Sequence, residues 1–243
     1  MTDKIFLHVN PLNVNNDRFT LSDDESHHAK NVLRLKLGQK IWLIDGEGIA
    51  YTGEITSQNG STKGKIHETI SGEGENPWYL HLAIAVLKKP RFEFLIEKAT
   101  ELGVNKISII RMDRCGKQIV QDSRIKKLIL SAAKQCGRSI FPEIEEFSSL
   151  TNFIDQSTEK IVAANWEGKL SLSNYLSPGF KSTFCILIGP EGDFSDDELD
   201  TLNQKKIPIV TLGSRRLRSE TAGIYALSAM NEYYLNTREI IDV

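Results

Sequence analysis

Three arginine residues stand within four positions near the C-terminal end of the chain, at Arg215, Arg216 and Arg218. Like charges this close repel one another, so the cluster is costly unless an acidic partner or a phosphate neutralises it. Leu217, which stands among them, is hard to explain as an ordinary surface residue. The segment therefore predicts contact with an anion. The alternative is a loop of ion pairs that leads into a helix capped by Ser219.

A second loop has a composition suited to ligand binding. Residues 189–195 have the sequence Gly-Pro-Glu-Gly-Asp-Phe-Ser and follow an apolar run, Phe184–Ile188. Gly189 and Gly192 let the backbone approach a ligand closely, and Pro190 stiffens the turn. In open α/β sheets, ligands bind beyond the carboxyl ends of strands, which is where both loops are expected. The alternative is a plain turn between a strand and a helix.

Strands that alternate with helices must position these loops. Apolar runs predict strands, and apolar residues at helical spacing predict helices that cover both faces of a mostly parallel sheet. The expected strands are 80–87, 106–112, 160–164, 184–188 and 207–212, and the expected helices are 92–102, 125–133, 195–205 and 221–235.

The first 70 or so residues predict a different, mostly β module. A strand at Ile5–Val9 precedes a helix that begins at Ser22, where Glu25 completes the spacing of a capping box. Three short β runs follow, at 41–44, 49–56 and 63–70. The glycine-containing segment Ser71–Pro77 is the best candidate for a linker. We therefore expect a small barrel or curled sheet in residues 1–72 and an α/β domain in residues 73–243.

The composition limits the function classes. The 243 residues carry a net charge of -2, with 40% hydrophobic and 26% charged residues, as in ordinary globular proteins. Any contact with a polyanion must therefore be a local basic patch, and the alternative for each patch is a solvated helix face. Three widely spaced cysteines, no signal peptide within residues 1–19 and no apolar run of about 20 residues predict a cytoplasmic protein.

The common motifs for dinucleotides, nucleoside triphosphates, zinc proteases and serine hydrolases are absent from the sequence. His27 and His28 are adjacent, so on a helix they point in different directions and do not make a metal site. No metal is predicted.

Gly189-Pro190-Glu191-Gly192, followed by Leu212-Gly213-x-Arg215-x-Leu217-Arg218-x-Glu220-Thr221-Ala222, resembles the ribosomal RNA small subunit methyltransferase E family of the SPOUT superfamily. The resemblance extends over nearly the whole chain. It includes His27-His28 with Val32-Leu33-Arg34, the segment Lys98–Val104, and Gln135-Cys136-Gly137-Arg138.

The resemblance implies a knotted (trefoil) SPOUT-type parallel-sheet domain preceded by a PUA-like β-barrel domain that binds RNA. It implies methylation by S-adenosyl-L-methionine of N3 of a uridine, conventionally uridine 1498, in 16S ribosomal RNA. It also implies a homodimer, with no membrane and no metal. Two departures are Asp193, where the family usually has glycine, and Arg216, where an aliphatic residue is common. Cofactor binding survives both if the Asp193 side chain points to solvent and Arg216 faces outward. We expect activity to be retained, because the flanking Gly189, Gly192, Leu217 and Arg218 are intact.

The site residues follow from the resemblance. Arg218 would stabilise the uridine anion, and Glu220 is either the base or a structural residue at the start of its helix. Cofactor contacts are expected from Leu187, Gly189, Pro190, Glu191, Gly192, Leu212, Gly213, Leu217, Arg218, Thr221 and Ala222. RNA contacts are expected from His28, Lys30, Arg34, Lys89, Arg91, Arg138 and Arg215.

Three other functions remain open from the sequence. One is a ribose 2'-O-methyltransferase of the same superfamily. Another is a non-catalytic RNA-binding or ribosome-assembly factor that lost the cofactor site, with Asp193 as the lesion. The last is an unrelated α/β enzyme.

Overall fold

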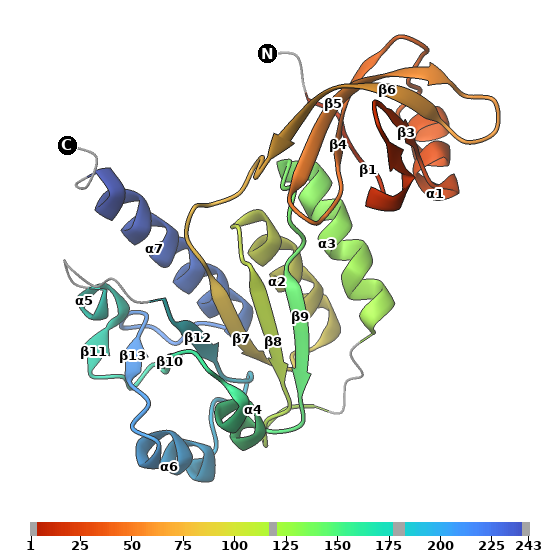
Figure 1. The fold of residues 1–243 in the computed structure, drawn as a ribbon. Coiled ribbons are helices and arrows are strands. Elements are labelled where there is room, and N and C mark those ends of the chain that lie inside the picture. Colours follow the sequence, from red (N-terminus) through yellow and green to blue (C-terminus); the bar gives the residue numbers. More distant parts are fainter. Residues whose placement is uncertain (1–3, 117–120, 177–182, 240–243) are drawn as a thin grey trace. The chain divides into compact units, whose positions relative to one another are not determined.

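The computed structural model describes residues 4–116, 121–176 and 183–239. The chain divides into two compact units (Figure 1). The first comprises Met1–Asn76 and Ile129–Phe141, and the second comprises Pro77–Leu128 and Pro142–Val243. The boundary falls within helix α3 (Asp122–Cys136), because Ala133 is buried with Ile44 and Ala50 of the first unit. The sequence placed this helix entirely in the second domain, since its periodicity shows an apolar face but not what covers it.

The described part of the first unit holds a six-stranded sheet in the order β1-β4-β5-β6-β3-β2, with β1 parallel to β4 and the other pairs antiparallel. At Gly64 a Cβ atom would lie 2.2 Å from both the Phe19 ring and the Glu54 carbonyl oxygen, so only glycine fits this curled region. The elements are β1 (Phe6–His8), η1 (Pro11–Asn13), β2 (Val14–Asn15), β3 (Arg18–Thr20), α1 (Asp23–His27), η2 (His28–Val32), β4 (Lys40–Ile44), β5 (Ile49–Ser57) and β6 (Lys63–Ser71).

The predicted capping box at Ser22 is only half correct. The Ser22 hydroxyl accepts a hydrogen bond from the Glu25 backbone N–H. The buried Glu25 carboxylate does not return to Ser22 but accepts hydrogen bonds from Lys134 Nζ at 2.7 Å and from the His8 backbone N–H at 3.0 Å. The spacing of Ser22 and Glu25 therefore predicted the start of α1 correctly, but the Glu25 carboxylate forms a tertiary ion pair with Lys134 instead of a cap.

The described residues of the second unit form a seven-stranded parallel sheet in the order β11-β13-β10-β12-β7-β8-β9. β13 is the last strand in the sequence, yet in the sheet it lies between β10 and β11. Such a strand order, in which a late strand lies between two earlier ones, agrees with the fold that the resemblance implies. The strands are β7 (His81–Ala85), β8 (Lys106–Ile110), β9 (Glu143–Phe147), β10 (Ile161–Ala164), β11 (Leu170–Ser171), β12 (Cys185–Ile188) and β13 (Ile209–Thr211). The helices other than α3 are α2 (Lys89–Glu101), α4 (Leu150–Gln156), α5 (Leu172–Tyr175), α6 (Asp196–Gln204) and α7 (Ser219–Glu239).

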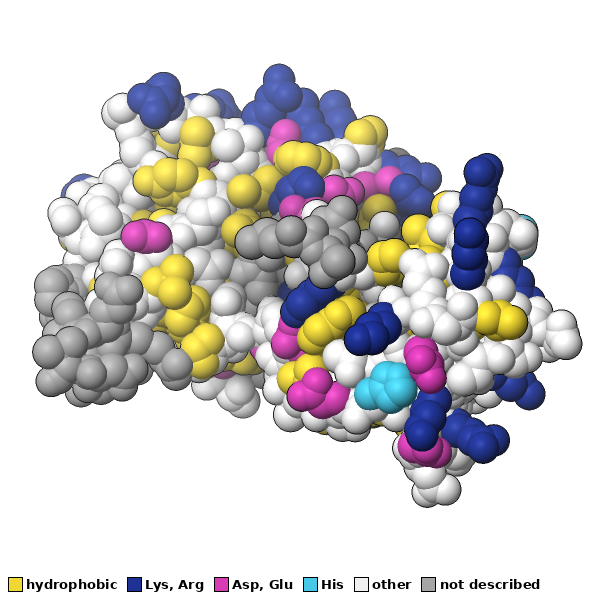
Figure 2. Space-filling model, turned by 90° about the horizontal axis from the view of Figure 1, so that it is seen from above, with side chains coloured by type: hydrophobic (Ala, Val, Ile, Leu, Met, Phe, Trp, Pro, Cys, Tyr) yellow, Lys and Arg dark blue, Asp and Glu magenta, His cyan; other side chains and the backbone are white. Residues whose placement is uncertain are grey.

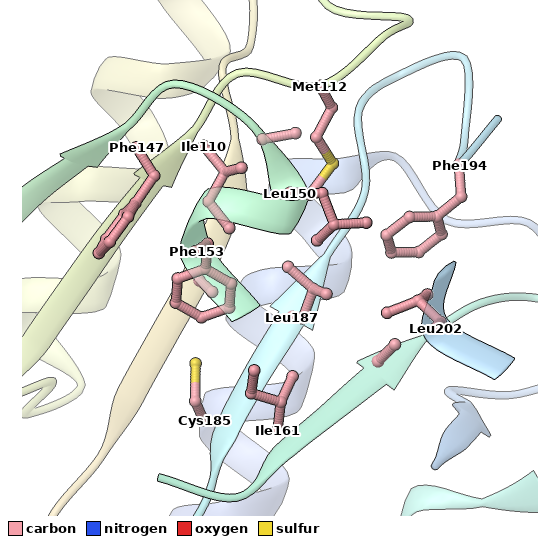
Figure 3. Close-up of a cluster of buried hydrophobic side chains, with 13 residues drawn as sticks. Ile110, Met112, Phe147, Leu150, Phe153, Ile161, Cys185, Leu187, Phe194 and Leu202 are labelled. Atoms are coloured by element: carbon pink, nitrogen blue, oxygen red, sulfur yellow. The ribbon is translucent and has the colours of Figure 1, made fainter. Parts of the chain in front are cut away.

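Alternate residues of the central strands face opposite sides of this sheet. Cys185 and Leu187 of β12 point toward α4 and α6, where they pack with Phe153 and Leu202 in a buried cluster (Figure 3). On the opposite face, α7 approaches β7 and α2 at Gly223, where a Cβ atom would lie 3.0 Å from Leu95. Helices on both faces explain why these strands are apolar throughout.

Four described elements of the second unit were not predicted from the sequence: β9, α4, β11 and α5. β9 is an edge strand with the sequence Glu-Ile-Glu-Glu-Phe, and only Phe147 in it is fully buried. Such a strand lacks the continuous apolar run that identifies a central strand. No described helix is long and apolar enough to cross a membrane.

Candidate functional site

A pocket of about 240 Å³ lies in the second unit at the carboxyl ends of β10, β12 and β13. These strands are neighbours in the parallel sheet, so the loops that follow them converge at one edge. The pocket lies where the sequence predicted a ligand site. The predicted residues that line it are Arg91, Gly189, Pro190, Glu191, Leu212, Gly213, Arg215, Leu217, Arg218 and Ala222.

Three predicted cofactor residues do not line this pocket. The Leu187 side chain is fully buried and points into the hydrophobic cluster (Figure 3). Gly192 is exposed, and its carbonyl accepts a hydrogen bond from Arg114 Nη1 at 3.0 Å. Thr221 is exposed in the first turn of α7.

The loop after β12 is held in one conformation by its own hydrogen bonds. The Asp193 backbone N–H donates to the Pro190 carbonyl at 2.9 Å, which closes a four-residue turn. Arg114 Nη1 donates to the Phe194 carbonyl at 2.9 Å as well as to Gly192. Ser195 and Glu198 then form the predicted capping box at the start of α6. The structure therefore presents a rigid loop to the pocket.

Asp193 does not point to solvent, so the condition under which the sequence predicted an undisturbed cofactor site is not met. Its Oδ1 atom accepts hydrogen bonds from Asn165 Nδ2 at 3.0 Å and from the Phe194 backbone N–H at 2.9 Å. Its φ angle of 64° is in the left-handed region, which favours glycine but which aspartate also adopts. This backbone conformation gives a physical reason for a glycine at this position in relatives.

Arg91 links the loop after β12 to the start of α7. Its Nη1 atom lies 3.1 Å from Glu191 Oε1, and its Nε atom lies 3.7 Å from Glu220 Oε1. The Glu220 side chain is buried, does not line the pocket, and its Oε2 atom has no hydrogen-bond partner among the described residues. This placement favours the structural alternative for Glu220 over the role of a base.

The arginines of the loop after β13 have a different environment. Arg215, Arg216 and Arg218 are exposed and line the pocket, and none of them forms an ion pair with a carboxylate of the described residues. Arg216 is exposed but it also lines the pocket, so it does not simply face outward. The loop thus concentrates positive charge that the described protein does not neutralise, at a position where a bound anion would contact it.

The sequence analysis missed the third wall of the pocket, which is the loop after β10. Asn165 and Trp166 lie there, and 52% of the Trp166 surface is exposed. The rule that identified the other two loops applies equally to this one, because a strand was expected at 160–164. The remaining lining residues that were not predicted as contacts are Ala164, Ile188, Asp193, Arg216 and Ser219.

The predicted RNA contacts in the first unit have mixed environments. Lys30 Nζ donates to the Gly60 carbonyl, and Arg34 is exposed with a φ of 53°. His28 is half-buried. Its pKa is lowered, mainly by burial and to a smaller extent by the nearby positive charge of Lys134.

Arg138 corrects a prediction, because it is 1% exposed and its Nη2 atom lies 2.9 Å from Glu75 Oε2. A buried, paired guanidinium is not available to an RNA phosphate.

The two remaining predicted RNA contacts belong to the second unit. Lys89 is largely exposed and lies 4.0 Å from Glu93. Arg91 is engaged with two glutamates, as described above. On the face seen in Figure 2, basic and acidic side chains are interspersed, in agreement with the small net charge.

Comparison with known proteins identifies the family of this chain. Residues 74–231 match the RNA methyltransferase domain, and residues 21–62 match the RNA methyltransferase PUA domain. The ribosomal RNA small subunit methyltransferase E of Rickettsia conorii is 31% identical over 91% of this chain and 93% of its own length. The chain belongs to the ribosomal RNA small subunit methyltransferase E family.

Solved structures support the same family. The ribosomal RNA small subunit methyltransferase E of Neisseria gonorrhoeae, solved with bound S-adenosylmethionine, is 25% identical with a TM-score of 0.84 over 95% of this chain and 98% of that one. A methyltransferase from Legionella pneumophila with bound cofactor is 28% identical, with the same TM-score and coverage. The SPOUT-type fold and the PUA-like domain expected from the sequence are confirmed.

The pocket at the strand ends is lined by both apolar and charged side chains. Among the described residues, no group of three or more histidine, cysteine, aspartate or glutamate side chains is arranged to hold a metal ion. The polar side chains that line the pocket are instead four arginines, two acidic residues, Asn165, Ser219 and the indole of Trp166.

Proposed function

We propose that this chain binds S-adenosylmethionine in the pocket at the ends of β10, β12 and β13 and methylates N3 of a uridine in 16S ribosomal RNA. The observation that carries this proposal is the convergence of three strand-end loops on one pocket in a chain of the methyltransferase E family. Two relatives with bound cofactor, from Neisseria gonorrhoeae and Legionella pneumophila, support the choice of methyl donor.

The lining of the pocket suits an adenosine-containing cofactor. Its apolar side chains would pack on a purine ring, as is usual for the apolar walls of ligand sites. At Gly213, whose φ is 133°, a Cβ atom would meet nothing within 4 Å, so the backbone of this residue borders open space. The apolar lining residues are Ala164, Ile188, Leu212, Leu217 and Ala222.

Bound in this pocket, the cofactor would supply a methyl group activated by a positively charged sulfur. The task of the protein is then to hold donor and acceptor in line and to exclude water, which can lower a barrier by ~7 to 11 kcal/mol. The rigid loop after β12 and the turn at Leu212 and Gly213 are suited to this positioning. No covalent intermediate with the protein is required.

The N3 atom of uridine carries a weakly acidic proton, and its lone pair becomes available when the proton leaves. Arg218 lines the pocket without a carboxylate partner among the described residues, so its charge would stabilise the anionic uracil ring. Glu220 is buried and lies 3.7 Å from Arg91 Nε, so it would position that arginine rather than remove the uridine proton.

The first unit would bind the RNA, and the working form would be a homodimer. Lys30, Arg34 and His28 of the first unit and Lys89 and Arg215 of the second are the proposed RNA contacts. Exposed apolar side chains on two helices of the second unit support a partner surface: Phe94 of α2 is 48% exposed, and Tyr225 and Leu235 of α7 are 50% and 53% exposed. Residues 1–72 and 73–243 are the proposed RNA-binding and methyltransferase domains.

The test is nucleoside analysis of 16S ribosomal RNA after incubation with the protein and cofactor carrying an isotopically labelled methyl group. Both naked RNA and small subunits should be used, taken from cells that lack this modification. Labelled 3-methyluridine is expected. A labelled 2'-O-methylated nucleoside would reject the base-methylation proposal in favour of ribose methylation.

Absence of cofactor binding in calorimetry at millimolar S-adenosylmethionine would instead favour a non-catalytic RNA-binding factor. Gly189→Val is a second test. A Cβ at this position would lie 3.2 Å from the buried Phe194 ring, so the valine side chain should displace the loop that lines the pocket. We expect this variant to lose cofactor affinity.

A further inference from the structure

Two carboxylates line the pocket, and they differ in how their charge is balanced. Glu191 lies 3.1 Å from the Arg91 guanidinium, so its charge is neutralised within the protein. Asp193 forms no ion pair with any of the described lysine, arginine or histidine side chains. The partners of its Oδ1 atom are two neutral donors, the Asn165 amide and the Phe194 backbone N–H. Asp193 therefore contributes an unbalanced negative charge to the pocket wall.

The position of this charge is fixed by its surroundings. The backbone of Asp193 is held by the turn to the Pro190 carbonyl, and its carboxylate is held by Asn165 from the loop after β10. Asn165 is itself fixed, because its Oδ1 atom accepts a hydrogen bond from the Glu167 backbone N–H at 2.7 Å. An ordered carboxylate of this kind can act on a ligand without first reorganising.

We propose that Asp193 is a specificity-determining residue whose carboxylate favours the positively charged methyl donor over its demethylated product. This inference rests on the proposed use of S-adenosylmethionine. Donor and product share the adenosine and the amino acid portion, and they differ by the methyl group and by the positive charge on sulfur. A fixed negative charge attracts the protonated α-amino group of both molecules equally, but it attracts the sulfur of the donor alone, so it acts on that difference.

Such selectivity would help turnover. The product leaves the sulfur neutral, and the attraction to Asp193 disappears at the moment of methyl transfer. Release of the product is then easier than it would be from a pocket that binds donor and product equally. Because Asp193 is half-exposed, water and salt would weaken the attraction, and we expect a modest effect rather than a large one.

Two substitutions separate the charge of Asp193 from its hydrogen bonds. Asp193→Asn removes the charge but keeps an oxygen acceptor for Asn165, and asparagine tolerates a φ of 64°. Asp193→Gly also suits this φ and removes both the charge and the link to Asn165. Alanine would add backbone strain and is a poorer choice.

The experiment is isothermal calorimetry of the full-length protein with S-adenosylmethionine and, separately, with S-adenosylhomocysteine. Asp193→Asn should weaken binding of the methyl donor by about five- to tenfold and binding of the product by less than about twofold. Asp193→Gly should show the same loss of selectivity and a further, equal loss for both ligands. Thermal unfolding with each ligand is an independent readout: the stabilisation by the two ligands should become similar in Asp193→Asn.

Equal weakening of both ligands by Asp193→Asn, or no change for either, would overturn the inference. Equal weakening would mean that the Asp193 carboxylate contacts a part of the ligand common to both molecules. No change would mean that the carboxylate contacts neither ligand. If the wild-type protein binds neither ligand, the proposed function itself fails. Binding of both ligands by the wild type, with unchanged selectivity in the variant, leaves the proposed function intact and removes only the role of Asp193.

Discussion

Arg138 of the first unit and two arginines of the second unit have opposite environments. Arg138 in the first unit is fully buried and is held by Glu75, whose carboxylate also accepts a hydrogen bond from the Ile140 backbone N–H at 2.9 Å. Arg215 and Arg218 in the second unit are exposed at a pocket and have no carboxylate partner among the described residues. The sequence predicted the same role, contact with RNA or its reacting base, for all three.

This difference shows which charges are available for function. A buried charge costs several kcal/mol to desolvate and is kept only where a partner compensates it, so Arg138 has a structural role. An exposed arginine without a partner keeps its donors for a ligand. We therefore expect substitutions of Arg138 to change stability and substitutions in the loop after β13 to change catalysis or RNA binding.

The largest effect is expected for Arg138→Ala. Removal of one member of a buried ion pair leaves Glu75 charged and uncompensated, which should lower the free energy of unfolding by about 3 to 5 kcal/mol. Urea denaturation followed by circular dichroism measures this change. Arg18→Ala, at an exposed position in β3, is the matched control and should change stability by less than about 0.5 kcal/mol. A stable Arg138→Ala protein with weak RNA binding would reverse our interpretation.

Arg218→Ala should lower kcat by about 100- to 1000-fold, the usual cost of losing one group that stabilises a developing anion. Its free energy of unfolding should stay within about 0.5 kcal/mol of the wild type, because no described ion pair is lost. Single-turnover methylation with saturating cofactor measures the rate. Arg218→Lys, which keeps the charge, should recover part of it. Normal turnover by Arg218→Ala would contradict the proposed role.

His81 extends the comparison to a buried titratable group in the second unit. Its Nε2 atom lies 2.8 Å from Ser108 Oγ and its Nδ1 atom lies 3.0 Å from Glu159 Oε2. Burial lowers the pKa of His81, although the hydrogen bond to Glu159 opposes the shift. Below pH ~6.5 the unfolded chain therefore binds more protons than the folded one, and stability should fall as the pH decreases.

The slope from this one group should not exceed about 1.4 kcal/mol per pH unit, and the contribution of His81 should become flat about one unit above pH ~6.5, where the unfolded imidazole is largely deprotonated. Urea denaturation at several pH values between 5 and 7.5 measures the slope. His81→Gln should be less stable than the wild type at neutral pH but should show a shallower slope. An unchanged slope would mean that His81 does not control this pH dependence, and that His8 and His28, whose pKa values burial also lowers, account for it.

The smallest effects are expected for Arg215→Ala and Arg216→Ala. If each arginine contacts one RNA phosphate, each substitution should weaken binding by a few fold and reduce the slope of log affinity against log salt concentration by about 0.7 to 0.9. Filter binding of 16S ribosomal RNA at several salt concentrations measures both quantities. A loss of affinity that does not depend on salt would point to a contact other than a phosphate.

Much of the site was predictable because it follows from local sequence. Apolar runs predicted the central strands, and glycine, proline and arginine after two of those strands predicted the loops that form the pocket. The rule that ligands bind at the carboxyl ends of parallel strands then predicted that the two loops meet. The loop of Asn165 and Trp166 follows a predicted strand as well, but its composition is ordinary, so only the structure identified it.

The sequence by itself determined the central strands with their main helices, the family and the two loops, because these depend on local periodicity and on motifs of fixed spacing. Only the tertiary structure decided which charged side chains have partners. Glu25 binds Lys134, Glu75 binds Arg138, and Asp193 binds Asn165, over separations of 109, 63 and 28 residues. Contacts at such separations depend on how the whole chain packs, so residue type alone did not distinguish a buried ion pair from a charge available to a ligand.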